Sequence, residues 1–525
     1  MEPLILSIDC GTQSVRALLF DRYGELKGKK KVEFEPYISK NPGWAEQDPK
    51  VYYNAICSAT KALREEVEGL WQQVIGVSIT TQRDTCVNVD INGEPLRYCI
   101  LWLDQRDALC TEKFSVGKRL AFRTVGMNEA VDITMRKSKS HWIKQNQPEI
   151  WQNTYKYLML SGYLNYKLTG KFIDSIGNQV GHIPFDYKKK QWPQSDNSYK
   201  WHLFGVEREK LPQLIEVGDI IGKITEKASK DTGIIEGTAV VASASDKACE
   251  TLGNGCMSPD CASISFGTTA TVQTTSKEYF EPIPFMPAYP AAMKGYYNPE
   301  VEIFRGYWMI TWFKKEFAHR EMIEAQERNI PPEEVLNEKL IKIPPGSQGL
   351  MLQPYWTPGL KMPEAKGAII GFSDVHTRAH IYRAIIEGIN YGLLDGIDKI
   401  ESKSHKKINK VFLSGGGSQS DIICEITSDM LNRPIYKVQT YETSGLGASI
   451  IAFVALGVYE SYSEAIKNMV NYTKNYKPNS ENVKIYSQLY SNVYQKIYPA
   501  LKGLYKEIRE ITGHENLSKE DGCNE

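Results

Sequence analysis

Two aspartates that follow strand-like stretches are the residues of this sequence best placed to do chemistry. Asp9 ends the apolar run LILSID, and a Gly-Thr turn at residues 11–12 comes soon after it. Asp246 ends a strand of small residues, AVVASASD, and the helical stretch KACETL follows. A carboxylate at a strand tip can organise a divalent cation or accept a proton. Both also have an ordinary interpretation, since Asp often caps a turn or a helix N-terminus.

The first of these carboxylates lies in a hairpin, SIDCGTQSVRALLFD, whose tight turn suits a phosphate group. Glycine lets the backbone amides approach a ligand closely. Side-chain donors and one positive charge come from Thr12, Gln13, Ser14 and Arg16. Asp9 would repel a phosphate directly, but a Mg²⁺ ion between the two anions removes that conflict. The hairpin therefore predicts a nucleotide–metal site, with a carboxylate that caps its own loop as the alternative.

A glycine triplet at residues 415–417 gives a second candidate nucleotide contact. The stretch KVFLSGGGSQSDIICEI has the form strand, glycine-rich turn, helix, which lets a nucleotide lie against the backbone at a helix N-terminus. It has neither the lysine of a P-loop nor the G-x-G-x-x-G spacing, and a flexible turn is the alternative. If Asp9 organises a metal, Asp246 could accept a proton from an attacking hydroxyl, and phosphoryl transfer needs little more.

An internal repeat connects the two halves of the chain. Residues 7–12, SIDCGT, are matched at four of six positions by residues 263–268, SISFGT, at an offset of 256 residues. In both places an apolar strand delivers a Gly-Thr turn. The repeat predicts a duplicated fold of two similar α/β halves, with the ligand bound in a cleft between them.

Composition excludes several classes of protein. The 525 residues predict two or three domains, and 63 basic side chains balance 63 acidic ones, which argues against binding to nucleic acid or to an anionic membrane. We expect no membrane span and no signal peptide, and hence a cytoplasmic protein. The ten cysteines form no C-x-x-C pair, so we expect reduced thiols and no zinc site.

Periodicity predicts the main elements. Strands are expected on both sides of the Gly11–Thr12 turn and over residues 410–413. Helical spacing is found in residues 49–67, 138–169 and 378–401. The tail from residue 461 is also expected to be helical, with a frayed end.

Taken in order, these segments resemble the FGGY carbohydrate kinases, the family of glycerol kinase, xylulokinase, ribulokinase and gluconokinase. The similarity extends from Leu4 to about Lys502. Beyond the first hairpin it rests on the strings GWAEQDP, TTQRDTCVNVD, LWLDQRD, YLNYKLTGKFIDS, SDKACETLGNG, SFGTTATV, GLMLQPYWTPG, RAIIEGINY, SGGGSQSD and ETSGLGASIIAFVALGVY.

The resemblance implies an α/β fold of two actin-like (ribonuclease H-like) domains of the sugar kinase, heat-shock protein and actin superfamily, with an interdomain cleft. We expect an N-terminal domain at 1–255, a C-terminal domain at 256–460, and a helical extension at 461–525. The family's activity is the transfer of the γ-phosphate of MgATP to a hydroxyl of a sugar or polyol.

By the same resemblance, each candidate residue takes a role. Asp246 is the catalytic base and Asp9 the metal residue. The substrate residues are Gln82, Arg83, Asp84 and Asp246, with Arg83 able to fork onto two oxygens. The ATP contacts are Thr12, Gln13, Ser14, Arg16, Gly267, Thr268, Gly415, Gly416 and Ser420.

Lys247 stands where glycerol kinases carry Gln and xylulokinases carry Asn. Lys247 and Lys137 could accommodate an acidic or larger sugar, but we expect both to point to solvent. The expected partner is a small sugar or polyol, and homo-oligomers occur in the family. The alternatives are a non-catalytic ATP- and sugar-binding regulatory member of the superfamily, and a chaperone or filament-forming ATPase.

Overall fold

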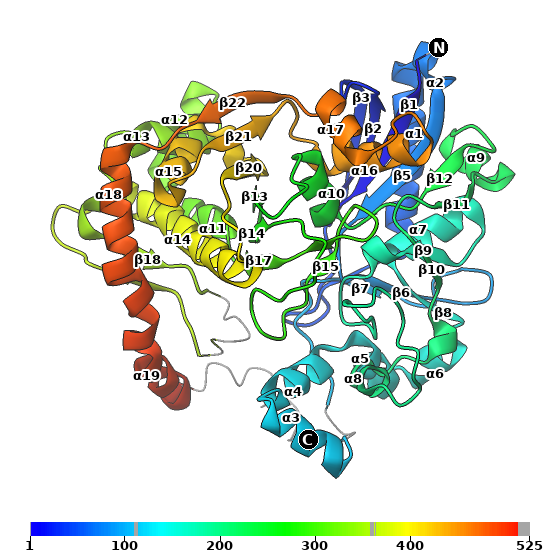
Figure 1. Ribbon diagram of the computed structural model, residues 1–525, viewed down its shortest axis with the longest axis horizontal. Helices are drawn as coiled ribbons and strands as arrows, with labels where there is room; N and C mark the ends of the chain where they lie inside the picture. Colours follow the sequence, from blue (N-terminus) through cyan, green and yellow to red (C-terminus); the bar gives the residue numbers. More distant parts are fainter. Residues whose placement is uncertain (1, 110–113, 357–361, 363, 513–525) are drawn as a thin grey trace.

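Two six-stranded sheets form the framework of the chain (Figure 1). The computed structural model describes residues 2–109, 114–356, 362 and 364–512. In spatial order, the first sheet consists of β11 (Ile220–Lys223), β12 (Ala239–Val241), β5 (Val74–Thr81), β1 (Leu4–Cys10), β2 (Ser14–Asp21) and β3 (Leu26–Glu33). The second consists of β22 (Tyr472–Tyr476), β21 (Ile435–Val438), β20 (Lys410–Ser414), β13 (Cys261–Phe266), β14 (Ala270–Gln273) and β17 (Glu300–Ile303).

The two sheets have the same strand directions. In the first, β1 pairs antiparallel with β2 and parallel with β5, which pairs parallel with β12. In the second, β13 pairs antiparallel with β14 and parallel with β20, which pairs parallel with β21. An antiparallel strand completes each side of each sheet. This equivalence agrees with the predicted duplication.

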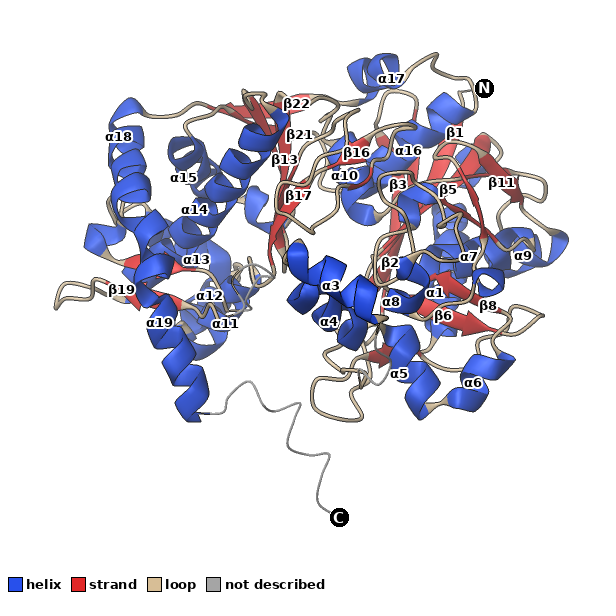
Figure 2. Cartoon of the chain, turned by 60° about the horizontal axis from the view of Figure 1, so that its bottom comes forward, coloured by secondary structure: helices blue, strands red, loops and turns tan. Residues whose placement is uncertain are grey.

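The remaining strands lie in smaller sheets (Figure 2). A four-stranded sheet contains β4 (Glu46–Gln47), β7 (Cys99–Ile100), β6 (Cys86–Val89) and β8 (Lys156–Met159). Three two-stranded pairs are β9 (Ile173–Ser175) with β10 (Gln213–Ile215), β15 (Tyr289–Pro290) with β16 (Tyr297–Asn298), and β18 (Met351–Gln353) with β19 (Ala368–Ile370).

Helices cover the sheets and fill the connections. Those before β13 are α1 (Pro49–Glu66), α2 (Glu68–Trp71), α3 (Val116–Thr124), α4 (Asn128–Lys137), α5 (Lys139–Asn146), α6 (Pro148–Asn153), α7 (Leu160–Thr169), α8 (Tyr199–Phe204), α9 (Glu226–Thr232) and α10 (Asp246–Gly253). Those after it are α11 (Trp308–Phe317), α12 (His319–Arg328), α13 (Pro332–Leu340), α14 (Arg378–Ser404), α15 (Asp421–Leu431), α16 (Thr443–Ala455), α17 (Tyr462–Met469), α18 (Ser480–Leu489) and α19 (Gln495–Thr512).

Strand β1 is buried along its whole length because both faces of its sheet are covered. Its sequence LILSIDC is accordingly a nearly continuous apolar run rather than an alternating one. On the flank, α1 begins where Asp48 caps the amide of Lys50 and Pro49 takes the first helical position. These local signals are the reason that both elements could be predicted.

Helices α10 and α16 join the two halves (Figure 1). An added Cβ at Gly253 would lie 2.0 Å from the carbonyl oxygen of Thr443, and one at Gly447 would lie 1.9 Å from that of Cys249. Both glycines are therefore required for the backbones to approach so closely. Helix α16 is apolar and buried along most of its length, and its apolar cluster includes Ile5 and Phe20 of the first sheet.

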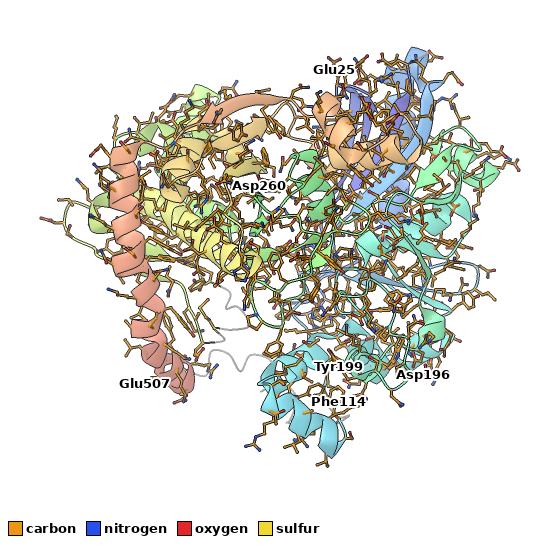
Figure 3. All side chains as sticks on the ribbon, in the orientation of Figure 1. Glu25, Phe114, Asp196, Tyr199, Asp260 and Glu507 are labelled. Atoms are coloured by element: carbon orange, nitrogen blue, oxygen red, sulfur yellow. The ribbon has the colours of Figure 1, made fainter. Side chains whose placement is uncertain are left out.

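A separate apolar cluster packs α3, α4 and α8 against one another. Phe114 and Tyr199 lie close together there (Figure 3), each in edge contact with Phe122 at 5.1 and 5.5 Å between ring centroids. Of the eight cysteines in the described part of the chain, all are free thiols and seven are buried. Among these same residues, no helix is long and apolar enough to cross a bilayer.

Two secondary-structure predictions are wrong in part. Residues 138–169 are not continuously helical, because Lys156–Met159 forms β8 and pairs with β6. A short apolar run such as YLML fits a buried strand as well as a helix. The tail after residue 461 also contains β22, an edge strand whose residues are mostly exposed and which therefore lacks an alternating pattern.

Candidate active site

Parallel strand ends bring the predicted residues of the first half to one edge of its sheet. Strands β1, β5 and β12 run parallel, so their carboxyl ends meet. Asp9 lies at the end of β1, Gln82 follows β5, and Asp246 lies a short loop beyond β12. In the second sheet, β13 and β20 deliver Gly267 and Gly415 at adjacent strand ends in the same way. The topology therefore groups residues that are far apart in the sequence.

Asp9 is buried and carries an ion pair. Its carboxylate accepts a hydrogen bond from Arg16 Nη1 at 2.8 Å, and Arg16 Nε lies 3.6 Å from Glu442 on the loop before α16. Burial raises the pKa of Asp9 to about 6, which Arg16 opposes and the negative charges of Asp246 and Glu442 reinforce. The negative charges of Asp9 and Asp246 therefore interact, as is expected if both carboxylates belong to one site.

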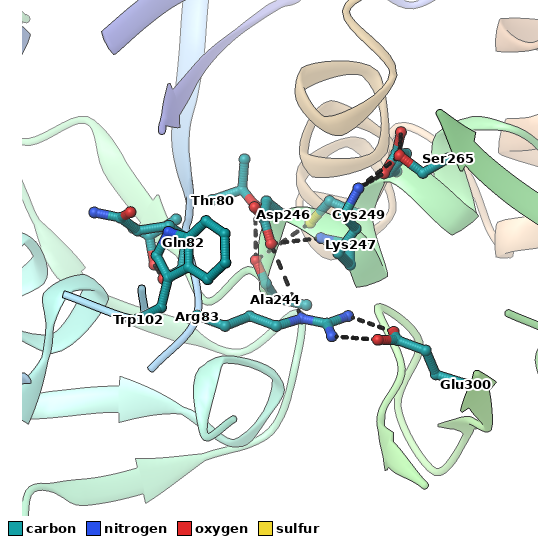
Figure 4. Close-up of polar contacts among 12 residues, drawn as sticks. Thr80, Gln82, Arg83, Trp102, Ala244, Asp246, Lys247, Cys249, Ser265 and Glu300 are labelled. Atoms are coloured by element: carbon teal, nitrogen blue, oxygen red, sulfur yellow. Dashed lines mark hydrogen bonds and ion pairs between the residues drawn. The ribbon is translucent and has the colours of Figure 1, made fainter. Parts of the chain in front are cut away.

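Asp246 is the first residue of α10, and Ser245 rather than Asp246 is the N-cap. Its Oδ1 accepts the backbone amide of Lys247 at 2.8 Å, so the carboxylate does interact with the start of its own helix. The same oxygen lies 4.0 Å from Arg83 Nε (Figure 4). Burial raises the pKa of Asp246, while Arg83 and Lys247 partly oppose the shift. A carboxylate of raised pKa beside two cations has the properties of a general base.

Lys247 does not point to solvent, contrary to expectation. Its Nζ donates to Glu250 at 2.9 Å and to Ser265 of β13 at 2.6 Å. Burial alone would lower its pKa, but the carboxylates of Glu250 and Asp246 raise it. Glu250 also accepts from the hydroxyls of Ser265 and Ser414 at 2.9 and 2.6 Å. The helix that carries Asp246 is therefore tied to both central strands of the second sheet.

Lys137 is also paired, although its side chain keeps 34% of its surface exposed. Its Nζ lies 2.7 Å from the Asp107 carboxylate and donates to the Gln105 carbonyl oxygen at 3.0 Å. The expectation that it points to solvent is therefore correct only for part of the side chain.

Arg83 bridges the two halves. Its Nη1 and Nη2 donate to the two carboxylate oxygens of Glu300 on β17, each at 2.9 Å (Figure 4). The fork that we expected on two substrate oxygens is therefore engaged by Glu300. The guanidinium also lies over the ring of Tyr289, 5.0 Å from its centroid. On the same strand, burial and the charge of Glu300 raise the pKa of Glu302 to about 8.

Asp84 lies between two basic side chains. Its Oδ2 is 2.9 Å from Lys139 Nζ and 2.9 Å from His182 Nδ1. Burial would raise the pKa of Asp84, but these partners lower it well below its usual range. The residue has a positive φ of 45°, and Gly181 packs against it so closely that a Cβ there would lie 2.4 Å from Asp84 Oδ1. Asp84 is thus a fixed carboxylate.

Gln82, one of the predicted substrate residues, is hydrogen-bonded to the first hairpin. Its Oε1 accepts from the Thr12 hydroxyl at 2.7 Å, and its Nε2 donates to Tyr52 at 3.0 Å. Trp102 Nε1 donates to Thr12 at 3.0 Å. Of the remaining hairpin residues, Gln13 is exposed and Ser14 is buried. The Thr12 side chain is therefore oriented by its neighbours before any ligand binds.

The glycine turns of the second half suit a close backbone approach. Gly415 has φ +80°, and a Cβ there would lie 2.8 Å from the backbone of Phe266. At Gly416, by contrast, an added Cβ would meet no atom within 4 Å. Ser420 is the N-cap of α15, and its side chain makes no capping hydrogen bond. Trp308 N donates to the Thr268 carbonyl oxygen at 3.3 Å, and Tyr307 N donates to that of Gly267 at 3.0 Å.

The donor set fits a metal that is held mainly by water and phosphate. Among the described residues, no group of three His, Cys, Asp or Glu side chains could enclose a metal ion. The negative charges of Asp9 and Asp246 nevertheless act on each other, whereas Glu442, the third carboxylate near Asp9, is paired with both Arg16 and Lys29. Mg²⁺ often keeps several waters and takes only one or two carboxylates, which matches this arrangement.

Comparison with known proteins identifies the family. The model for "FGGY family of carbohydrate kinases, N-terminal domain" matches residues 4–253, and the model for the C-terminal domain matches residues 262–456. The chain belongs to the FGGY carbohydrate kinases. As a member of that family it is an ATP-dependent carbohydrate kinase, a phosphotransferase with an alcohol group as acceptor.

Relatives of this kinase match it over almost its whole length. A xylulose kinase of Lactococcus lactis is 28% identical over 523 residues, which cover 97% of each chain. A crystal structure of gluconate kinase from Lactobacillus acidophilus has a TM-score of 0.81 at 22% identity and covers 97% of this chain and 100% of that one. The xylulose kinase of Rhodospirillum rubrum has a TM-score of 0.82 at 22% identity, with coverages of 96% and 100%. These structures confirm the expected two-domain fold.

Several residues around the site of this FGGY kinase were not predicted. Glu250 lies one helical turn after Asp246, a spacing that could have indicated it. Glu300 and Glu302 alternate on one strand, which places both on the same face. Lys139, His182 and Glu442 gave no sequence signal, because only the fold brings them to their partners. The division into domains at 255 and 460 stays a prediction, although α16 packs on the first sheet.

Proposed function

We propose that this kinase transfers the γ-phosphoryl group of MgATP to a hydroxyl of a sugar or polyol, with Asp246 as the general base. One observation carries the assignment. Asp9 on the first hairpin pairs in register with Thr80, whose hydroxyl donates at 2.9 Å to the carbonyl oxygen of Ala244, two residues before Asp246. The adjacent Lys247 donates to Ser265, two residues before the Gly267 turn of the second hairpin. The candidate base therefore lies between the two turns that we assign to the phosphates.

In this proposal the phosphates of ATP lie between the turns at residues 11–14 and 267–268, with Arg16 near the first. The adenosine lies against Gly415 and Gly416, beside Ser420. Asp9 would hold Mg²⁺, which would supply neutralisation of the negative charge on the phosphates. The sugar is bound by Gln82, Arg83 and Asp84, whose side chains are fixed by contacts within the protein.

The transfer step needs one proton acceptor and an aligned hydroxyl. Asp246 accepts the proton as the hydroxyl oxygen bonds to the γ-phosphorus and the bond to the β–γ bridging oxygen breaks, which releases ADP. Burial raises the pKa of Asp246, and the positive charges of Arg83 and Lys247 oppose this shift and so favour the carboxylate form that accepts a proton. Holding the hydroxyl beside the base and the phosphate supplies much of the rate enhancement.

A coupled assay of ADP release tests this function. We expect that neutral ketoses and polyols stimulate ADP release by the wild-type protein well above its rate without sugar. ATP binding without ADP release for any carbohydrate in a panel of ketoses, aldoses, polyols and sugar acids would instead indicate a regulatory binding protein. Turnover of ATP at a rate that no carbohydrate changes would point to an ATPase of the wider superfamily.

A further inference from the structure

The ion pair between Arg83 and Glu300 has a consequence for the chemical class of the substrate. Both terminal nitrogens of Arg83 are engaged by Glu300, and its Nε has no hydrogen-bond partner and faces Asp246 at 4.0 Å (Figure 4). The Glu300 side chain is only 4% exposed and that of Arg83 only 15%. A bidentate pair of this kind is strong and directional, so Arg83 is not free to bind a second carboxylate through its fork.

The other described cations around the base are paired in the same way. Lys139 lies 2.9 Å from the Asp84 carboxylate, and Lys247 lies 2.9 Å from that of Glu250. Arg83, Lys139 and Lys247 are thus each paired with a carboxylate of the protein, and Asp246 is a further negative charge beside Arg83 and Lys247. An ionised Glu302, whose pKa is raised to about 8, would add to this negative charge.

This balance of charge disfavours a negatively charged substrate. A sugar acid would bring a carboxylate toward Asp246 and Glu300, where the charges of Arg83 and Lys247 are already neutralised by Glu300 and Glu250, so like charges would repel it. Hydroxyl groups meet no such penalty, since each can donate to a carboxylate and accept from Arg83 Nε or Lys247. The comparison proteins include a gluconate kinase as well as xylulose kinases. Proteins of this fold are therefore named for a charged sugar and for a neutral one, so the fold alone does not decide between these two classes of substrate.

We propose that Glu300 is a specificity-determining residue, which neutralises Arg83 and so restricts this kinase to uncharged sugars or polyols. The inference rests on the proposed function, since it concerns the same sugar site. Glu300 acts through Arg83 and is a positioning residue rather than a catalytic one. Because it lies on β17 of the second sheet while Arg83 follows β5 of the first, the selectivity depends on contact between the two halves.

The test compares kcat/KM for D-xylulose and for D-gluconate in the wild type and in Glu300→Gln. The wild type should favour D-xylulose by about 100-fold or more. In Glu300→Gln the freed guanidinium can bind the gluconate carboxylate, so this ratio should fall by about tenfold or more, mainly through a lower KM for gluconate. A ratio that stays the same in Glu300→Gln, or a wild type that prefers gluconate, would overturn the inference.

Two controls separate charge from folding. Glu300→Asp keeps the negative charge and should keep the preference for D-xylulose even if both rates fall. Glu321→Gln removes another buried glutamate of the same half, which pairs with Lys339 and Arg378 at 3.0 and 3.1 Å, and should leave the ratio unchanged. A loss of preference in either control would contradict a specific role for the Glu300 charge. If neither sugar nor any other carbohydrate stimulates ADP release by the wild type, the proposed function itself fails.

Discussion

The hairpins β1–β2 and β13–β14 of this kinase have the same strand arrangement but carry different functional groups. Strands β1 and β2 are equivalent to β13 and β14 in direction and in position within their sheets. In the sequence repeat, however, Asp9 of the first hairpin corresponds to Ser265 of the second. Asp9 is a carboxylate paired with Arg16, whereas Ser265 bonds to Lys247 and Glu250 of α10. The strand arrangement is therefore duplicated, whereas the side chains at the equivalent positions 9 and 265 differ.

This difference indicates how a duplicated fold divides the work of one reaction. In the proposed mechanism, the first hairpin supplies the charge that a metal–phosphate group needs. The second hairpin holds α10, which carries the proposed base. A carboxylate at position 265 would face Glu250 and repel it, so a repeat of Asp9 would not fit there. The comparison leads to four predictions, from the largest expected effect to the smallest.

Asp246→Asn should cause the largest loss of activity, because it removes the proposed proton acceptor without changing the shape of the site. We expect kcat to fall by about 10³-fold, with the KM for the sugar changed much less. Steady-state assay of ADP release measures both. A loss of only a few-fold would show that the base lies elsewhere.

Asp9→Asn and Ser265→Ala test the two hairpins at equivalent positions. Asp9→Asn should lower kcat/KM for MgATP by about 100-fold, since the metal loses its carboxylate. Ser265→Ala removes two hydrogen bonds to α10 and should cost about tenfold or less. Nearly equal losses would mean that the hairpins act alike, which would remove the proposed division of roles.

Gly447→Ala should destabilise the junction of the halves. Its Cβ would lie 1.9 Å from a backbone oxygen of α10, so the helices must move apart at a cost of about 3 kcal/mol or more. We expect a melting temperature lower by about 5 °C in thermal unfolding. Gly503→Ala in α19, where a Cβ meets no atom within 4 Å, is the matched control and should be neutral or slightly stabilising.

Glu302→Gln should have the smallest effect, and one that depends on pH. The folded-state pKa of Glu302 is raised to about 8, so between about pH 4.5 and 8 the unfolded chain ionises this group while the folded chain does not. The wild type thus loses stability relative to the variant as the pH rises through this range. The melting temperature of Glu302→Gln should exceed that of the wild type by about 2 °C at pH 8.5 and equal it near pH 4.5. A constant difference at all pH values would contradict the shift.

A feature of this structure could be predicted from the sequence only where the residues that form it lie close together along the chain. Asp9 with its Gly-Thr turn, the glycine triplet before α15, and the long helix α14 could all be predicted, because each pattern lies within a few residues. The Arg83–Glu300 pair could not, since its members are 217 positions apart and only the packing of two sheets joins them. Likewise β22 has no buried face, so no periodicity marks it as a strand.

A crystal structure with a non-hydrolysable ATP analogue and Mn²⁺ tests the central claim most directly, because the anomalous signal of manganese locates the metal. We predict that the γ-phosphate lies between the Gly11–Thr12 and Gly267–Thr268 turns, with the metal beside Asp9 and the adenosine against Gly415–Gly416. A nucleotide that touches only one of the two hairpins, or a metal remote from Asp9, would contradict the assignment of one shared site to both halves.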